Sequence, residues 1–175
     1  MEYFIVVAIL LMIITPILSV LPSSRQRKQM RLRKVAMSLG INIEITSIDD
    51  PDPLQEKYLS SSGKQLAAII PVIAYRLALA KSRAWDSLQR VNWAIERDIK
   101  GEDSSLPSTW CWKGEKPKGL SPKLSEFIIS NIESLPEDVI RVDEYSQIVS
   151  IYWREAGDEE GLQSIHHFLG NCVKL

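Results

Sequence analysis

The sequence predicts an α+β protein: one N-terminal transmembrane helix followed by a single small cytosolic α+β domain. Three observations support this prediction. An uncharged apolar run extends from Tyr3 to Leu21, and a cluster of basic residues follows it closely. After that, helical and strand-like patterns come in mixed order, without the alternation of a βαβ protein. We therefore interpret residues 1–22 as a membrane anchor, 23–40 as a basic amphipathic juxtamembrane helix and 41–175 as the domain.

The apolar run has the length of a single membrane span. As a helix it would cover about 28 Å, close to the hydrocarbon thickness of a bilayer. Glu2 is the only charge that precedes it, which argues against a cleavable signal peptide. Because the flanking positive charge is all C-terminal, the positive-inside rule predicts the orientation of this single-pass protein. Its N-terminus would lie outside and its C-terminal domain in the cytoplasm.

The basic cluster is predicted to lie at the membrane surface. It consists of Arg25, Arg27, Lys28, Arg31, Arg33 and Lys34. These side chains would attract anionic lipid headgroups, so the predicted partners are the lipid bilayer and another membrane protein. From Val35 onward, fifteen basic residues stand against 21 acidic ones. Nucleic-acid binding usually needs a basic face on the folded domain, so nucleic acid is not an expected partner.

The first elements after the anchor follow from spacing and capping. Ser23 or Ser24 caps a helix that ends near Gly40, and its apolar stripe can rest on the domain or on the headgroups. The alternation in 41–45 predicts a half-buried strand. The acidic segment 49–53 is interpreted as a solvated turn, with a cation site as the alternative. Residues 66–80 are predicted to form a core strand, with a second membrane span as the alternative.

The middle of the chain is less regular. The spacing of apolar residues predicts a helix over 84–99, although a strand around 85–91 is also compatible. Residues 101–119 are rich in Pro, Gly, Ser and Lys, which predicts a long loop. Within it, Trp110 and Trp112 either hold the loop against the core or form an exposed anchor for a partner.

The last third of the chain gives clearer patterns. A helix is expected from Ser121-Pro122 to about Leu135. Two strands, 139–142 and 148–153, are separated by a polar turn and predict a hairpin. A final helix should begin near Asp158, where acidic residues suit the positive end of the helix dipole, and continue to Cys172.

No residue pattern identifies catalytic, cofactor or metal chemistry. His166 and His167 are adjacent, so on a helix they point about 100° apart and do not share a metal easily. Cys111 and Cys172 lack a CxxC partner and are interpreted as plain thiols. Ser61 and Lys64 have the Ser-x-x-Lys spacing of some acyl-transfer enzymes, but the accompanying motifs are absent.

The first 46 residues resemble YajC, the small accessory subunit of the bacterial preprotein translocase. The resemblance rests on the apolar run, then Leu21-Pro22 and Arg25-Gln26-Arg27-Lys28, then Ser38-Leu39-Gly40 and Ile43 to Thr46. The Gly-Asp and twin-Gly strand motif of that family is missing here. The whole chain looks more like uncharacterised single-pass inner-membrane proteins of gammaproteobacteria, a resemblance that implies a location in the bacterial inner membrane but no particular activity.

The sequence thus predicts a membrane-tethered, non-enzymatic interaction or accessory subunit of an inner-membrane complex, with no cofactor. The alternative is a membrane-anchored enzyme whose site is assembled from residues distant in sequence. A pocket that gathers His166, Glu155, Arg76 or Ser61 would favour the enzyme. An exposed Trp or apolar patch would favour the interaction subunit.

Overall fold

A computed structural model describes residues 2–79, 90–97, 105–107 and 109–175. The chain divides into two compact units, Met1–Arg31 and Leu32–Leu175. The functional surfaces discussed below all belong to the second unit.

The first unit contains α1 (Glu2–Val20). Its described side chains lie between Tyr3 and Thr15 and are exposed. No helix in the described part of the chain meets the length and apolarity that a membrane span requires. By this finding the predicted transmembrane anchor at 1–22 is wrong, and so is the predicted single-pass inner-membrane location.

Helix α2 (Ser24–Ser38) begins in the first unit and ends in the second. Its start is a capping box, in which the Gln26 backbone N–H donates to Ser23 Oγ and the Ser23 N–H donates to Gln26 Oε1. Leu32 and Ala36 are 1% and 0% exposed and join the core of the second unit. The apolar stripe of α2 therefore packs on the domain, which settles one of the two alternatives.

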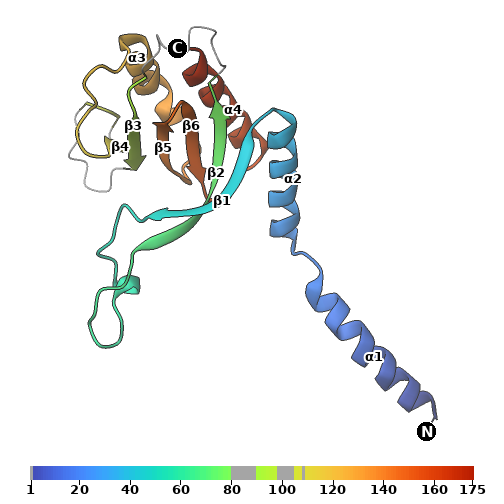
Figure 1. Cartoon of the computed structure of the whole chain (residues 1–175). Coiled ribbons are helices and arrows are strands. Elements are labelled where there is room, and N and C mark those ends of the chain that lie inside the picture. The colour runs from blue at the N-terminus through green and yellow to red at the C-terminus, as the bar shows by residue number, and fades with distance from the viewer. Residues whose placement is uncertain (1, 80–89, 98–104, 108) are drawn as a thin grey trace. The chain divides into compact units, whose positions relative to one another are not determined.

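The second unit is built on a six-stranded antiparallel sheet in the order β1-β2-β6-β5-β3-β4 (Figure 1). The strands are β1 (Asn42–Asp49), β2 (Ile69–Ala78), β3 (Trp93–Arg97), β4 (Trp110–Trp112), β5 (Val139–Tyr145) and β6 (Ile148–Trp153). The predicted 139–153 hairpin is confirmed, and its turn holds Ser146 and Gln147 at φ 51° and 65°. Both residues thus have the positive φ that two-residue hairpin turns of type I′ require.

The helices gather on one face of the sheet, which we call the helix face. Here α4 (Glu159–Lys174) packs against β6, β2 and α3 (Pro122–Asn131). A short 3₁₀ turn, η2 (Ile132–Ser134), continues α3. Period-two alternation on the strands and 3.6-residue periodicity on the helices supply the buried side chains. The largest fully buried ones are Trp110, Trp153, Tyr75, Phe168, Leu32, Ile41, Ile95, Ile128, Ile132, Ile151, Leu162 and Ile165.

Two predicted elements differ from the structure. The part of 84–99 that is described forms strand β3, not a helix; residues 84–89, 98 and 99 lie outside the described chain. Trp93 and Ile95 alternate with Ala94 and Glu96, so a period of two governs this segment. The predicted loop 101–119 contains strand β4, which pairs with β3 and places both of its indoles in the core.

Candidate functional site

The face of the sheet opposite the helix face carries mostly polar side chains along its centre, and we call it the polar face. In antiparallel pairs, residues directly opposite each other point to the same side of the sheet. The register therefore defines two parallel rows on this face. One row is Glu96, Arg141, Tyr152, Ala74 and Glu44; the next is Ala94, Asp143, Ser150, Arg76 and Asn42.

The arginines of the polar face are held by carboxylates from neighbouring strands. Arg141 Nη2 lies 3.1 Å from Glu96 Oε2, and the Arg141 guanidinium lies 5.9 Å from the centre of the Tyr152 ring. Arg76 Nη1 donates to Glu44 Oε2. The Nε atoms of both arginines are buried and have no hydrogen-bond partner among the described residues. Both guanidiniums thus retain donors that contacts within the described chain do not satisfy.

A pocket of about 270 Å³ opens on this face beside the β5–β6 turn. Its lining residues are Arg76, Asp143, Tyr145, Ser146, Ile148, Ser150 and Tyr152. Burial raises the pKa of the Asp143 carboxyl above its ordinary value, although the neighbouring Tyr152 and Ser150 hydroxyls and the charges of Arg141 and Arg76 act in the opposite direction. Burial, together with the nearby Asp143 charge, also raises the pKa of Tyr152. Convergent polar groups with shifted pKa values in a hollow are typical of binding and catalytic sites.

Asp143 and Asp50 should give opposite pH dependence. Because burial raises the pKa of Asp143, its contribution to stability is full at acidic pH and is lost as pH rises through the raised value. Burial opposes ionisation of Asp50, but hydrogen bonds from Tyr58, the Asp52 N–H and Lys57 lower its pKa overall. The contribution of Asp50 is therefore present at neutral pH and is lost as pH falls through the lowered value.

The two Asp→Asn variants separate these effects. Relative to the parent, Asp143→Asn should raise the free energy of unfolding at pH 7, and the difference should vanish below about pH 4. Asp50→Asn should lower it at pH 7, and that difference should also shrink in acid. Urea unfolding between pH 3 and pH 8 measures both curves. Changes of the same sign in the two variants would contradict the assignment.

A second candidate surface is strand β1, which pairs only with β2 in the described chain and so forms one edge of the sheet. The Asp50 N–H donates to Ala68 O just beyond the paired region. Because the ladder alternates, Asn42, Glu44, Thr46 and Ile48 also point their N–H and C=O groups toward β2. The outward backbone groups then belong to Ile43, Ile45, Ser47 and Asp49.

One of the β1 residues whose backbone N–H and C=O groups point away from β2 is an exposed isoleucine. Ile45 is 73% exposed, and its side chain lies on the helix face beyond the helices. By register, Pro71 and Ile69 of β2 lie on the same face farther along the hairpin; both are exposed, Ile69 by 51%. Free backbone groups and exposed apolar side chains thus lie together at this edge.

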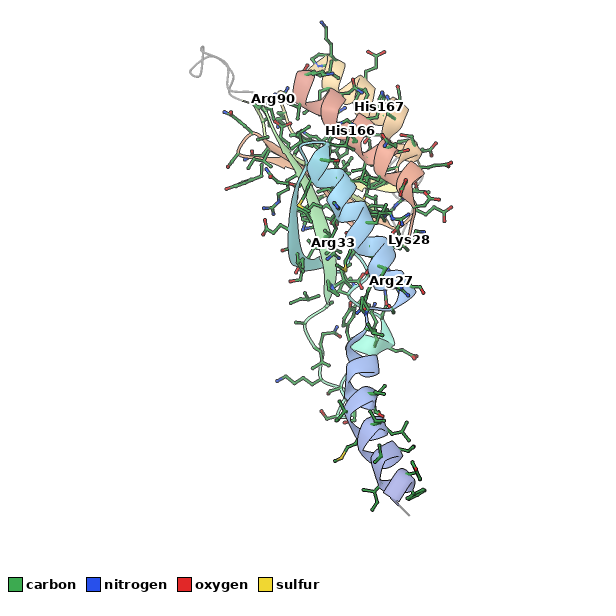
Figure 2. The ribbon with its side chains drawn as sticks, turned by 90° about the vertical axis from the view of Figure 1, so that its right-hand side faces the viewer. Arg27, Lys28, Arg33, Arg90, His166 and His167 are labelled. Carbon is green, nitrogen blue, oxygen red and sulfur yellow. The ribbon has the colours of Figure 1, made fainter. Side chains whose placement is uncertain are left out.

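Of the six basic residues predicted to bind the membrane surface, the structure gives Arg33 a different role. Arg33 donates to the fully buried Glu155 carboxylate, with Nη2 2.6 Å from Oε2 and Nε 2.8 Å from Oε1. The Tyr75 hydroxyl donates to the same Oε1 at 2.8 Å. Figure 2 shows Arg33 on α2. The other five members, Arg25, Arg27, Lys28, Arg31 and Lys34, are exposed.

The two loop tryptophans lie in the core. Trp110 is 0% and Trp112 is 6% exposed. The Arg97 guanidinium stacks over the Trp110 ring at 4.2 Å, and Trp112 Nε1 donates to Ser105 Oγ at 3.1 Å. These residues therefore hold the segment against the core, and they do not form an exposed anchor for a partner.

The residues that would have marked an assembled enzyme site do not gather in one pocket. Arg76 lines the polar-face pocket, whereas Glu155 is enclosed by Arg33 and Tyr75 on the helix face. Ser61 is exposed in the loop between β1 and β2. His166 and His167 lie on α4 (Figure 2), and His167 contacts Asn171.

No metal site was predicted, and the described residues contain no group of three or more His, Cys, Asp or Glu side chains that could hold a metal ion. The Cys111 thiol donates to Glu96 O, and the Cys172 thiol is buried. The acidic segment at 49–53 is not a solvated turn throughout. Asp50 is 7% exposed and accepts hydrogen bonds from Tyr58 and Lys57.

A larger pocket, of about 540 Å³, lies between the segment before α3 and α3 itself. Its charged members, Lys116 and Glu126, are both exposed. Their charges are therefore screened by water, and this hollow offers less for recognition than the polar-face pocket.

Sequence reasoning missed the polar-face cluster, although the sequence contains a signal for it. Arg141 and Asp143 on β5, and Ser150 and Tyr152 on β6, are spaced by two, although the predicted first strand of the hairpin ended at Val142, before Asp143. Once a two-residue turn fixes the register, all four side chains must share a face. The participation of Arg76 could not be inferred in the same way, because β2 lies far from the hairpin in sequence.

No family model, curated protein or solved structure matches this chain. The resemblance to YajC stays a prediction.

Proposed function

We propose that this chain is a non-enzymatic interaction subunit that binds a partner protein by adding a strand of the partner to its sheet at β1. The observation that carries the proposal is the open edge of β1, with outward backbone groups on alternate residues and Ile45 exposed by 73%. Backbone hydrogen bonds supply the affinity in strand addition, and side-chain pockets supply the specificity.

The two edges of the sheet are not equivalent in this respect. Strand β4, at the other edge, has three residues, whereas β1 has eight. Natural proteins usually protect a long edge with charge or proline. Along β1 the exposed acidic residues are Glu44, which pairs with Arg76, and Asp49 at the end of the strand, and Ile45 and Ser47 lie between them. A long, weakly protected edge is therefore a suitable docking site.

The chemistry of the edge indicates which strand would fit. In an antiparallel addition, the partner residue directly opposite Ile45 would point to the helix face and meet Ile45. A β-branched or aromatic residue is favoured there. A basic residue of the partner strand opposite Asp49 would pair with its carboxylate. The expected partner segment is thus extended, apolar in its middle and basic at one end.

Site-specific photo-crosslinking tests the proposal in the full-length chain inside its own cells. A benzoylphenylalanine placed at position 45 should yield a discrete adduct, whereas the same residue at the exposed Glu160 of α4 should not. Adding Ser47→Pro should abolish the adduct, because it removes an outward N–H without breaking the ladder to β2.

Stability of the variants is the necessary control. Ser47→Pro should melt close to the parent, whereas Thr46→Pro should melt lower because it removes an N–H that bonds β2. Equal adduct at positions 45 and 160, or an adduct that survives Ser47→Pro, would rule out docking at this edge.

A further inference from the structure

We propose that the pocket on the polar face binds a small zwitterion, a molecule that carries one ammonium and one carboxylate group as a free amino acid does. This inference concerns a different surface from the β1 edge and does not rest on the proposed function. It is carried by the arrangement of Arg76, Asp143 and the two hydroxyls between the central strands.

The pocket is lined by one positively charged side chain, Arg76, and one negatively charged side chain, Asp143. Arg76 and Asp143 lie in the same row, separated by Ser150 on the strand between them. Adjacent strands are about 4.8 Å apart, so the two backbones lie about 10 Å from each other and their side chains flank the same space. The charge of Arg141 is already matched by Glu96 at 3.1 Å. An ammonium would thus meet Asp143 and a carboxylate would meet Arg76.

Asp143 and Arg76 both keep hydrogen-bonding capacity that contacts within the described chain do not use. The neighbouring Tyr152 and Ser150 hydroxyls and the charges of Arg141 and Arg76 favour the ionised Asp143 carboxylate, and a carboxylate has about four lone-pair sites. Arg76 donates through Nη1 to Glu44, whose side chain is 51% exposed on the edge strand. A pair so exposed is weakly held in water. The buried Nε of Arg76 lacks a partner among the described residues, which leaves the guanidinium short of acceptors.

The small volume of the pocket and its two opposite charges disfavour drug-sized ligands, lone anions and lone cations. A volume of about 270 Å³ lies just below the range of about 300–1,000 Å³ of pockets that hold drug-sized ligands. A phosphate or other lone anion would be repelled by Asp143, and a lone cation would be repelled by Arg76. Burial raises the pKa of Asp143, and an ammonium placed against it would favour the charged carboxylate.

The test uses the purified full-length chain and the twenty free amino acids as probes, each at about 10 mM, in thermal unfolding. At least one amino acid should raise the melting temperature, whereas acetate and methylamine, which carry one charge each, should not. By calorimetry, Asp143→Asn and Arg76→Gln should each weaken the affinity of that amino acid at least tenfold. Glu160→Gln, an exposed charge on α4, should leave it unchanged.

Two further variants keep the test decisive if the charge changes disturb folding. Tyr152→Phe and Ser150→Ala keep both charges, and each should weaken binding by a smaller factor. No shift with any amino acid would overturn the proposal. So would an equal shift with acetate, or affinity that survives both charge variants in folded protein.

Discussion

Replacing Arg33 with alanine should lower the free energy of unfolding by about 3–5 kcal/mol, the usual result of removing one partner from a buried ion pair. The reason is that the substitution leaves the buried Glu155 carboxylate without its cationic partner. The Glu155 side chain is 0% exposed, and among the described residues it would keep the Tyr75 hydroxyl alone as a side-chain donor. Urea unfolding followed by circular dichroism measures the loss.

The adjacent residue provides a matched control. Lys34→Ala removes the same charge from the same helix, but Lys34 is exposed, so the change should stay within about 0.5 kcal/mol. The double variant Arg33→Met with Glu155→Met should recover much of the loss, because it leaves no buried charge. If Arg33→Ala unfolds like the parent, the Arg33–Glu155 contact does not hold α2 to the domain.

The backbone at Glu155 supports the same conclusion. Glu155 has φ 54°, in the left-handed region that costs a residue with a side chain roughly 1–2 kcal/mol. Glycine would avoid that strain. A glutamate at this position is explained by the carboxylate, which accepts from both Arg33 and Tyr75.

The sequence predicted correctly those helices and strands whose formation is determined by residues within the element or next to it. The helix at 24–38, the hairpin at 139–153 and the final helix each carry their own capping, turn or periodicity signal, and each is confirmed. The segment Trp93–Arg97 was predicted wrongly because its apolar residues fit two periods. Pairing with β5 and β4 decides between them, and such pairing cannot be read from the segment alone.

The functional surfaces were harder to predict because both depend on long-range register. Arg33 looked like one more member of a basic cluster; its partner Glu155 lies 122 positions away. The polar-face pocket needs Arg76 beside Ser150, a contact that only the β2–β6 pairing creates. The open edge at β1 follows from strand order, which no local pattern specifies. The apolar run at 3–21 was interpreted from its length, its lack of charge and the basic residues that follow it, and the membrane prediction drawn from it is corrected by the structure.

Replacing Trp110 with alanine should lower the free energy of unfolding by about 3–5 kcal/mol, as large-to-small changes of buried aromatic residues do. Trp110 is 0% exposed, and its ring also supports the Arg97 guanidinium at 4.2 Å. The substitution would open a cavity beneath β4 and leave Arg97 without its stacking surface. Denaturant unfolding monitored by circular dichroism measures the effect.

The neighbouring residue separates a structural role from a binding role. Cys111 lies on the same strand, on the polar face, and is partly exposed, so Cys111→Ala should cost about 1 kcal/mol or less. A partner cannot touch Trp110 unless the core opens, so the photo-crosslinked adduct at position 45 should persist in Trp110→Ala wherever the variant is folded. Loss of that adduct with unchanged stability would instead make Trp110 part of a partner-binding surface, against its burial in the core.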